Sequence, residues 1–132
     1  MAAGHVEEAG SEALLARKEE LARAITEALY AEMPDLMEKY GESGRAKCLQ
    51  DMRYNLEHLA PAVALGEPAL FARYVAWLRD MLGARGIPAD EVRRSLELTQ
   101  DFVRVRLAAE QAELVAAAVA AGLNALAEER HA

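Results

Sequence analysis

The chain has 132 residues, a hydrophobic fraction of 53%, an aromatic fraction of 5% and a formal net charge of -7. This length fits one domain with one core, and the acidic surplus removes any long-range attraction to nucleic acid or anionic lipid. Much of the apolar content is alanine, the residue with the highest helix propensity. The composition therefore predicts a single all-α domain that binds neither nucleic acid nor membrane.

The location of the protein is predicted from what the sequence lacks. The N-terminus has no basic region followed by an apolar core, and no apolar run of eighteen residues occurs later in the chain. The single cysteine, Cys48, has no partner for an intramolecular disulfide, which fits a reducing compartment. We expect a cytoplasmic protein.

The first part of the chain predicts a disordered N-terminus at residues 1–10, followed by one helical-bundle domain at residues 11–130. Ser11 is a candidate cap for a helix over residues 11–33. Its apolar residues recur at helical spacing: Leu14, Leu21, Ile25 and Leu29. Pro34 should end this helix or restart it.

The second and third predicted helices cover residues 44–65 and 68–83. Asp35 to Gly44 fits one or two helical turns, and a helix over residues 44–65 then carries a core row of Leu49, Met52, Leu56, Leu59 and Val63. Pro61 lies in its last turns and favours a kink or an end there. A third helix over 68–83 has Pro68 at its first position, and the glycines and proline of Gly83 to Pro88 end it.

The remaining segment, residues 89–128, contains no proline or cluster of helix breakers and predicts one long helix. It either bends near Arg106 to Glu113 or extends away from the bundle. Its second half has a narrow apolar seam of Val115, Val119, Leu123 and Leu126, flanked by alanines. Either a second chain covers this seam, giving a homodimer through the C-terminal helix, or the first helix of the same chain does. The predicted fold is an all-α, four-helix bundle with a long C-terminal helix.

A candidate binding site lies on the stretch from Cys48 to Pro61, where polar residues border the core row. Such groups near a core must be hydrogen-bonded or in contact with solvent or a ligand. In one interpretation they form a pocket between the second and third predicted helices, because bundle interiors host such sites. Its walls would be Asp51, Tyr54, Asn55 and His58 on one helix, and Arg73, Tyr74 and Trp77 on the next. In the other interpretation these residues contact only each other and water.

Catalysis and metal binding are not predicted. His5 and His131 lie near the two ends of the chain, and neither Glu-x-x-His nor Cys-x-x-Cys occurs. Cys48, on an apolar helix face, fits a small core residue better than a nucleophile. No glycine-rich phosphate loop is present. The expectation is therefore a protein that is not an enzyme and has no metal site.

Three stretches, "GRAKCLQD", "LGEPALFARYVAWL" and "RGIP", lie within Tyr40 to Pro88. This span resembles a helical module of bacterial sensor and regulatory proteins, including ones in which it precedes a cobalamin-binding domain. The resemblance implies a histidine at the position of Asn55, where this chain departs. The Asp-x-His-x-x-Gly motif that would hold cobalamin is absent, as are residues for the domain around it. A complete cobalamin-binding protein is therefore not implied. The resemblance implies either a helical cap or a free-standing relative of the module, with another ligand or with none.

Three hypotheses of function follow. The first is a non-enzymatic sensory or regulatory domain that binds a small molecule or tetrapyrrole-like cofactor between the second and third helices. The alternative is a ligand-free dimeric interaction module that uses the C-terminal helix. The third, histidine phosphotransfer at His58, is disfavoured because the lysine and glycine expected after such a histidine are missing and Pro61 follows within one turn.

Overall fold

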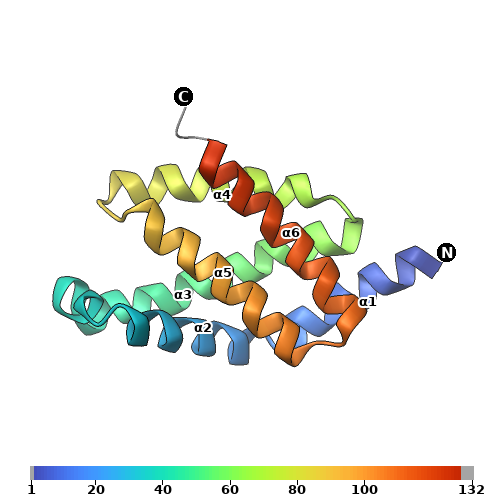
Figure 1. Ribbon diagram of the computed structural model, residues 1–132, viewed down its shortest axis with the longest axis horizontal. Helices are drawn as coiled ribbons and strands as arrows, with labels where there is room; N and C mark the ends of the chain where they lie inside the picture. The colour runs from blue at the N-terminus through green and yellow to red at the C-terminus, as the bar shows by residue number, and fades with distance from the viewer. Residues whose placement is uncertain (1, 129–132) are drawn as a thin grey trace.

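The computed structural model describes residues 2–128, and within that range it contains six helices (Figure 1). Their bounds are α1 Ala2–Ala16, α2 Lys18–Glu32, α3 Asp35–Leu65, α4 Pro68–Ala84, α5 Ala89–Arg106 and α6 Ala109–Glu128. The all-α prediction is confirmed for these residues. The four-helix bundle is wrong, because two of its helices are each divided into two that run in different directions.

The six helices share one apolar core. α6 packs along α4 and against α5, while α1 lies on α3 and α6, and α2 lies between α3 and α5 (Figure 1). The largest fully buried side chains come from all six helices and include Leu14, Ile25, Leu56, Phe71, Leu96 and Val115. No single helix could bury such a face alone, so the packing of the six helices fixes their directions.

The first division is at Arg17, between α1 and α2, where the helix predicted over residues 11–33 is interrupted. Arg17 has φ −106° and ψ 13°, and Lys18 forms an ion pair with Glu57 of α3 at 2.7 Å. The break lets α1 lie on α3 and α6 and lets α2 lie on α3 and α5. Lys18 interrupts the apolar row between Leu14 and Leu21 next to this break, but one charged position did not predict a change of direction.

The second division is at Leu107, and it overturns the long C-terminal helix predicted over residues 89–128. Leu107 is extended, with φ −106° and ψ 159°, and is only 8% exposed. Arg104 of α5 pairs with Glu113 of α6 at 3.1 Å across the corner. The bend lies between Arg106 and Glu113, where the sequence predicted it as one of two alternatives. It turns α6 back onto α4.

The seam of α6 is covered within the chain. Val115 and Val119 are fully buried and Leu126 is 6% exposed, because α4, α5 and α1 surround this helix. The alternative in which the first helix covers the seam is thus correct in part, with α4 as the main contact. The apolar seam no longer argues for a second chain.

The N-terminus also differs from its prediction. Residues 2–10, expected to be disordered, belong to α1, and Gly10 and Ser11 are buried. A Cβ on Gly10 would lie 3.3 Å from Val63 of α3 and 3.8 Å from Gln111 of α6. The absence of a side chain at Gly10 therefore permits α1 to approach both helices, and packing rather than local propensity makes this segment helical.

The helix α3 starts at Asp35, earlier than the predicted residue 44, and contains a kink at Gly41. The glycine has φ 68° and ψ −169°, a conformation that is essentially confined to glycine. Pro61 neither ends nor divides the helix, which continues to Leu65 with Gly66 as its left-handed cap. The kink directs the turn that carries Leu36 and Tyr40 over one end of the core.

A search of residues 2–128 for membrane spans finds no helix that is both long and apolar enough to cross a bilayer. The cytoplasmic location stays a prediction.

Candidate functional site

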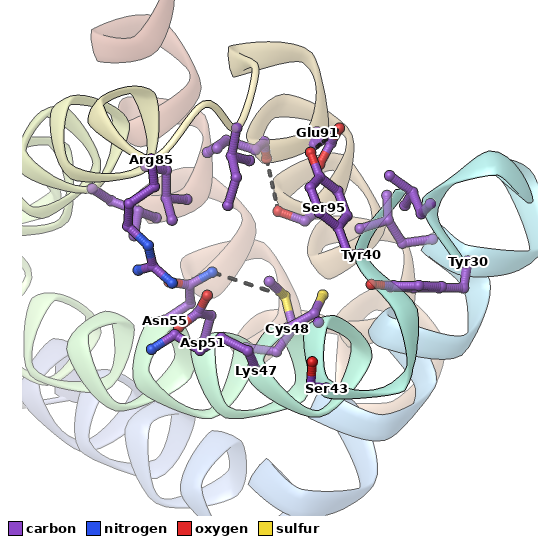
Figure 2. Close-up of a pocket in the computed structure, with 18 residues that line it drawn as sticks. Tyr30, Tyr40, Ser43, Lys47, Cys48, Asp51, Asn55, Arg85, Glu91 and Ser95 are labelled. Atoms are coloured by element: carbon purple, nitrogen blue, oxygen red, sulfur yellow. Dashed lines mark hydrogen bonds between the residues drawn. The ribbon is translucent and has the colours of Figure 1, made fainter. Parts of the chain in front are cut away.

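A cavity of about 430 Å³ opens at the end of the molecule where α2 ends, α3 begins, α4 ends and α5 begins (Figure 2). Its volume is within the range of roughly 300 to 1,000 Å³ that is typical of small-molecule sites. One side of the wall is apolar and is built from Leu29, Leu36, Met52, Leu78, Leu82, Ile87 and Val92. The other side carries charged and polar groups from α3 and α5 and from the connection after α4.

The only thiol of the chain, that of Cys48, belongs to the cavity wall. Burial raises its pKa to about 11, although Thr26 beside it acts in the opposite direction. The thiol is therefore protonated at neutral pH, and it lies on the same face of α3 as Asp51, three residues further along the helix.

The Asp51 carboxylate lines the cavity without a hydrogen bond or an ion pair to any residue that the structure describes. Burial raises its pKa, and the cations Lys47 and Arg85 oppose this effect. Lys47 and Arg85 line the same cavity, and Figure 2 shows Arg85 opposite α3. A carboxylate with unused acceptor capacity between two cations can accept N–H groups from a ligand.

The α5 side of the cavity is held by a different acidic group. Glu91 accepts a hydrogen bond from the Tyr40 hydroxyl at 3.4 Å and lies 3.7 Å from the Lys39 ammonium. Ser95 is satisfied by its own helix, since its hydroxyl donates to the Val92 carbonyl at 2.8 Å. The contacts of Tyr40 and Lys39 with Glu91 tie the start of α3 to α5 beside the cavity.

Comparison with known proteins gives one decisive match. The family model described as phycobilisome protein matches residues 7–126, which is most of the chain. The chain belongs to the phycobilisome protein family. No curated protein matches it.

Membership of the phycobilisome family corrects three predictions. The resemblance to the module that precedes cobalamin-binding domains is wrong. The sensory, regulatory and signalling function inferred from it is wrong too, because the family consists of light-harvesting pigment proteins. The fold is the globin-like, all-helical fold of that family and not a four-helix bundle. At the level of the family, its members are not enzymes, form oligomers and bind bilins, which are tetrapyrroles.

The structure divides the seven predicted site residues into two groups. Asp51 and Asn55 line the cavity, whereas the other five do not. Tyr74 reaches the cavity only indirectly, because its hydroxyl donates to Oδ1 of Asn55 at 2.6 Å. Arg73 points to solvent from α4 as an exposed residue.

His58, Tyr74 and Trp77 instead form an aromatic cluster where α3 and α4 meet, and Tyr54 lies one turn before His58 on α3. The His58 and Tyr74 rings are stacked, with centroids 4.1 Å apart and planes 11° apart, and the Tyr74 and Trp77 centroids are 5.9 Å apart. His58 is within 2.9 Å of the Tyr54 carbonyl through Nδ1. Tyr54 is 46% exposed and Trp77 is 57% exposed. In place of a second cavity wall, these residues cover the outside of α3.

Sequence reasoning missed most of the polar lining, namely Tyr30, Tyr40, Ser43, Lys47, Cys48, Arg85, Glu91 and Ser95. Cys48 and Asp51 were within reach, because a spacing of three places them on one helix face, but the thiol was interpreted as core. Arg85 and Glu91 line the cavity only because α4 and α5 pack against α3 there. This packing could not be predicted while the bounds of the helices were wrong. Among the described residues no group of three metal ligands occurs.

Proposed function

We propose that this chain binds a bilin, an open-chain tetrapyrrole pigment, in the cavity between α2, α3, α4 and α5, and that it serves as a pigment protein rather than an enzyme. The observation that carries the proposal is the placement of the only thiol and of an unpaired carboxylate, Cys48 and Asp51, on one wall of the cavity. Family membership supplies the class of ligand.

The chemistry of the lining fits such a ligand. A bilin offers flat apolar rings, central N–H donors, terminal carbonyl groups and two carboxylates. The leucines and Val92 suit the rings, and the Asp51 carboxylate suits the N–H groups because it has no partner of its own. Lys47 and Arg85 suit the carboxylates, as cations on the same wall.

Cys48 is the residue that we assign to covalent attachment. Its S–H would add across a carbon–carbon double bond in a pigment side chain: the sulfur bonds to one carbon, the thiol proton goes to the other, and the π bond is lost. No electrons are exchanged with an outside reagent, so no oxidant or reductant is required. Because burial raises the pKa of this thiol to about 11, spontaneous attachment at neutral pH should be slow.

The first test is the titration of the purified chain with biliverdin, followed by absorption spectroscopy and by mass spectrometry after denaturation. We expect saturable binding with a changed visible spectrum, weakened in Asp51→Asn, and a covalent adduct that is absent from Cys48→Ala. Glu38→Gln, which removes an exposed carboxylate of α3 outside the cavity, should bind as the wild type does. Equal binding by the wild type and Asp51→Asn would refute this site, and no binding by the wild type would refute the function.

The predicted site residues that do not line the cavity are not proposed to bind the pigment directly. Tyr74 acts through Asn55, while Tyr54, His58, Arg73 and Trp77 are not among the residues that line the cavity. We expect His58→Ala and Trp77→Ala to retain the pigment. Loss of the pigment in both variants would show that His58 and Trp77 do contribute to pigment binding.

We also infer that the chain self-associates, because oligomers are a property of the family. A homodimer through the C-terminal helix would have to use the outward face of α6, where Ala117 and Asn124 are exposed, since the apolar seam is buried. Sedimentation of the wild type and of Ala117→Glu tests this. A dimer that the substitution leaves intact would place the interface elsewhere.

A further inference from the structure

We propose that Asn55 is a hydrogen-bond donor to the bound pigment and that Tyr74 is the positioning residue that fixes its orientation. This inference rests on the proposed function, and it adds to Cys48 and Asp51 a third contact on the same helix. The acceptor is a carbonyl or carboxylate oxygen of the pigment.

The two ends of the Asn55 side chain have very different partners. The residue is 5% exposed, and its Oδ1 accepts a short bond of 2.6 Å from the Tyr74 hydroxyl. Within residues 2–128, its Nδ2 has only the Met52 sulfur as a partner, 3.9 Å away (Figure 2). A thioether is a weak acceptor, whereas an amide nitrogen carries two N–H donors. The amide therefore retains donor capacity on the side that lines the cavity.

A buried amide with unused donors is costly unless something accepts from it. Asn55 pays this cost on a helix face that otherwise carries Met52, Leu56 and Leu59, all of which are buried. The cost is explained if a ligand oxygen completes the hydrogen bonds of the amide.

Tyr74 determines which end of the amide faces the cavity. As a hydroxyl donor it selects the oxygen, and this leaves the NH₂ group on the cavity side. Burial raises the pKa of Tyr74, with Asp51 and Glu57 adding to the effect, so the hydroxyl keeps its proton. The ring is held between neighbours, because His58 stacks on it at 4.1 Å and Phe71, fully buried, lies 5.7 Å away between centroids.

The spacing along α3 suits a long ligand. Cys48 and Asp51 are separated by about 4.5 Å of helix rise, and Asp51 and Asn55 by about 6 Å. A thiol, an acceptor of N–H groups and a donor to oxygen thus follow one another along a single face. An open-chain tetrapyrrole presents a side-chain double bond, inner N–H groups and outer oxygens, so each group on the helix has a counterpart in the pigment.

The test uses the full chain and two probes, biliverdin and its dimethyl ester, with dissociation constants and absorption maxima as readouts. Asn55→Leu should weaken binding about tenfold, the equivalent of one buried hydrogen bond, and should shift the absorption maximum. Tyr74→Phe should weaken binding by less, because the freed amide can still present its NH₂ group part of the time. The double variant should match Asn55→Leu, since Tyr74 acts only through Asn55.

The ester separates the two kinds of acceptor. If the effect of Asn55→Leu is equally large with the dimethyl ester, the acceptor is a terminal carbonyl; if the effect is clearly smaller, the acceptor is a carboxylate, because an ester carbonyl is an uncharged and weaker acceptor. Asn55→Asp gives a second variant that keeps the oxygen for Tyr74 but has no N–H donor, and it should also bind weakly at pH 7. In the pigment-free chain, the side-chain amide resonances of Asn55 should change in Tyr74→Phe.

Two negative results have different meanings. If the wild type binds neither probe, the proposed function and this inference both fail. If the wild type binds and Asp51→Asn weakens binding, but Asn55→Leu and Asn55→Asp bind with unchanged affinity and absorption, only the role of Asn55 is overturned. If the effects of Asn55→Leu and Tyr74→Phe add in the double variant, Tyr74 does not act through Asn55.

Discussion

Gly122 of α6 lies against Phe71 of α4 so closely that a Cβ on the glycine would stand 2.9 Å from two atoms of the ring. The same Cβ would be 2.8 Å from Val75. Both neighbours are fully buried and have little room to move. We therefore expect Gly122→Ala to lower the free energy of unfolding by about 1 to 3 kcal/mol through overpacking, as measured by urea denaturation.

A matched control is available in the same pair of helices. Gly83, near the end of α4, has no atom within 4 Å of an added Cβ. Gly83→Ala should leave the unfolding free energy unchanged or raise it by up to about 1 kcal/mol, because alanine restricts the unfolded chain. Equal effects of the two substitutions would mean that the contact of α4 with α6 is looser than the structure shows.

Gly41 of α3 shapes the cavity wall through its backbone conformation. Gly41 has φ 68° and ψ −169°, and holding another residue in this conformation costs about 1 to 3 kcal/mol. Gly41→Ala should therefore destabilise the chain although nothing lies within 4 Å of the added Cβ. Since the kink carries Leu36 and Tyr40 to the cavity, biliverdin binding should weaken too. An unaffected dissociation constant would show that the turn before the kink is not part of the binding site.

The glycines also show where sequence reasoning succeeded. Pro68 was expected at the start of the third helix, and it begins α4, directly after the turn in which Gly66 caps α3 in a left-handed conformation. α4, with its proline start and glycine-rich end, matches its prediction within one residue at Ala84. Proline and glycine act locally, so their effects can be read from neighbouring positions.

The breaks at Arg17 and Leu107 had no such local cause. Neither position is a glycine or proline, and only Lys18 interrupts the apolar row near the first of them. The chain turns there because the change of direction buries Leu107 and lets α1 and α2 pack on α3, and α6 pack on α4; the exposed pair of Arg104 with Glu113 adds little. Contacts between residues far apart in the sequence decided these corners, and a helical wheel of one segment contains no such contacts.

The candidate site followed the same division. Asp51 and Asn55 were predicted because helical periodicity places them beside the core row, and both line the cavity. Trp77 was chosen because it lies on the next helix, yet it is 57% exposed. The residues that complete the cavity, Arg85 and Glu91, depend on the angle between α4 and α5. Which residues share a face of one helix was predictable, while the meeting of four helix ends at the cavity was not.

The reactivity of Cys48 gives a prediction that depends on pH. Burial raises the pKa of its thiol to about 11, and only the thiolate reacts with iodoacetamide. The alkylation rate of the folded chain should rise about tenfold per pH unit from pH 8 until it levels near pH 11. The chain unfolded in urea should level near pH 8.5. A folded rate that levels at the same pH as the unfolded one would contradict the burial of this thiol.

Replacement of Asp51 should stabilise the pigment-free chain while it weakens pigment binding. Burial raises the pKa of Asp51 above its ordinary value of 3.8, so the folded state holds the proton more tightly than the unfolded state. Stability is then lost as pH rises from about 4 through the folded pKa. Asp51→Asn does not titrate, so its advantage in unfolding free energy should be small near pH 4 and full at pH 7. Urea denaturation of both proteins across this range measures the difference, with Glu38→Gln as the control for an exposed carboxylate.

Two results would contradict this prediction. An advantage of Asp51→Asn that is constant with pH would show that desolvation of the charged carboxylate is not the cause. A lower stability of Asp51→Asn at pH 7 would show that Lys47 and Arg85 more than compensate for the burial of Asp51.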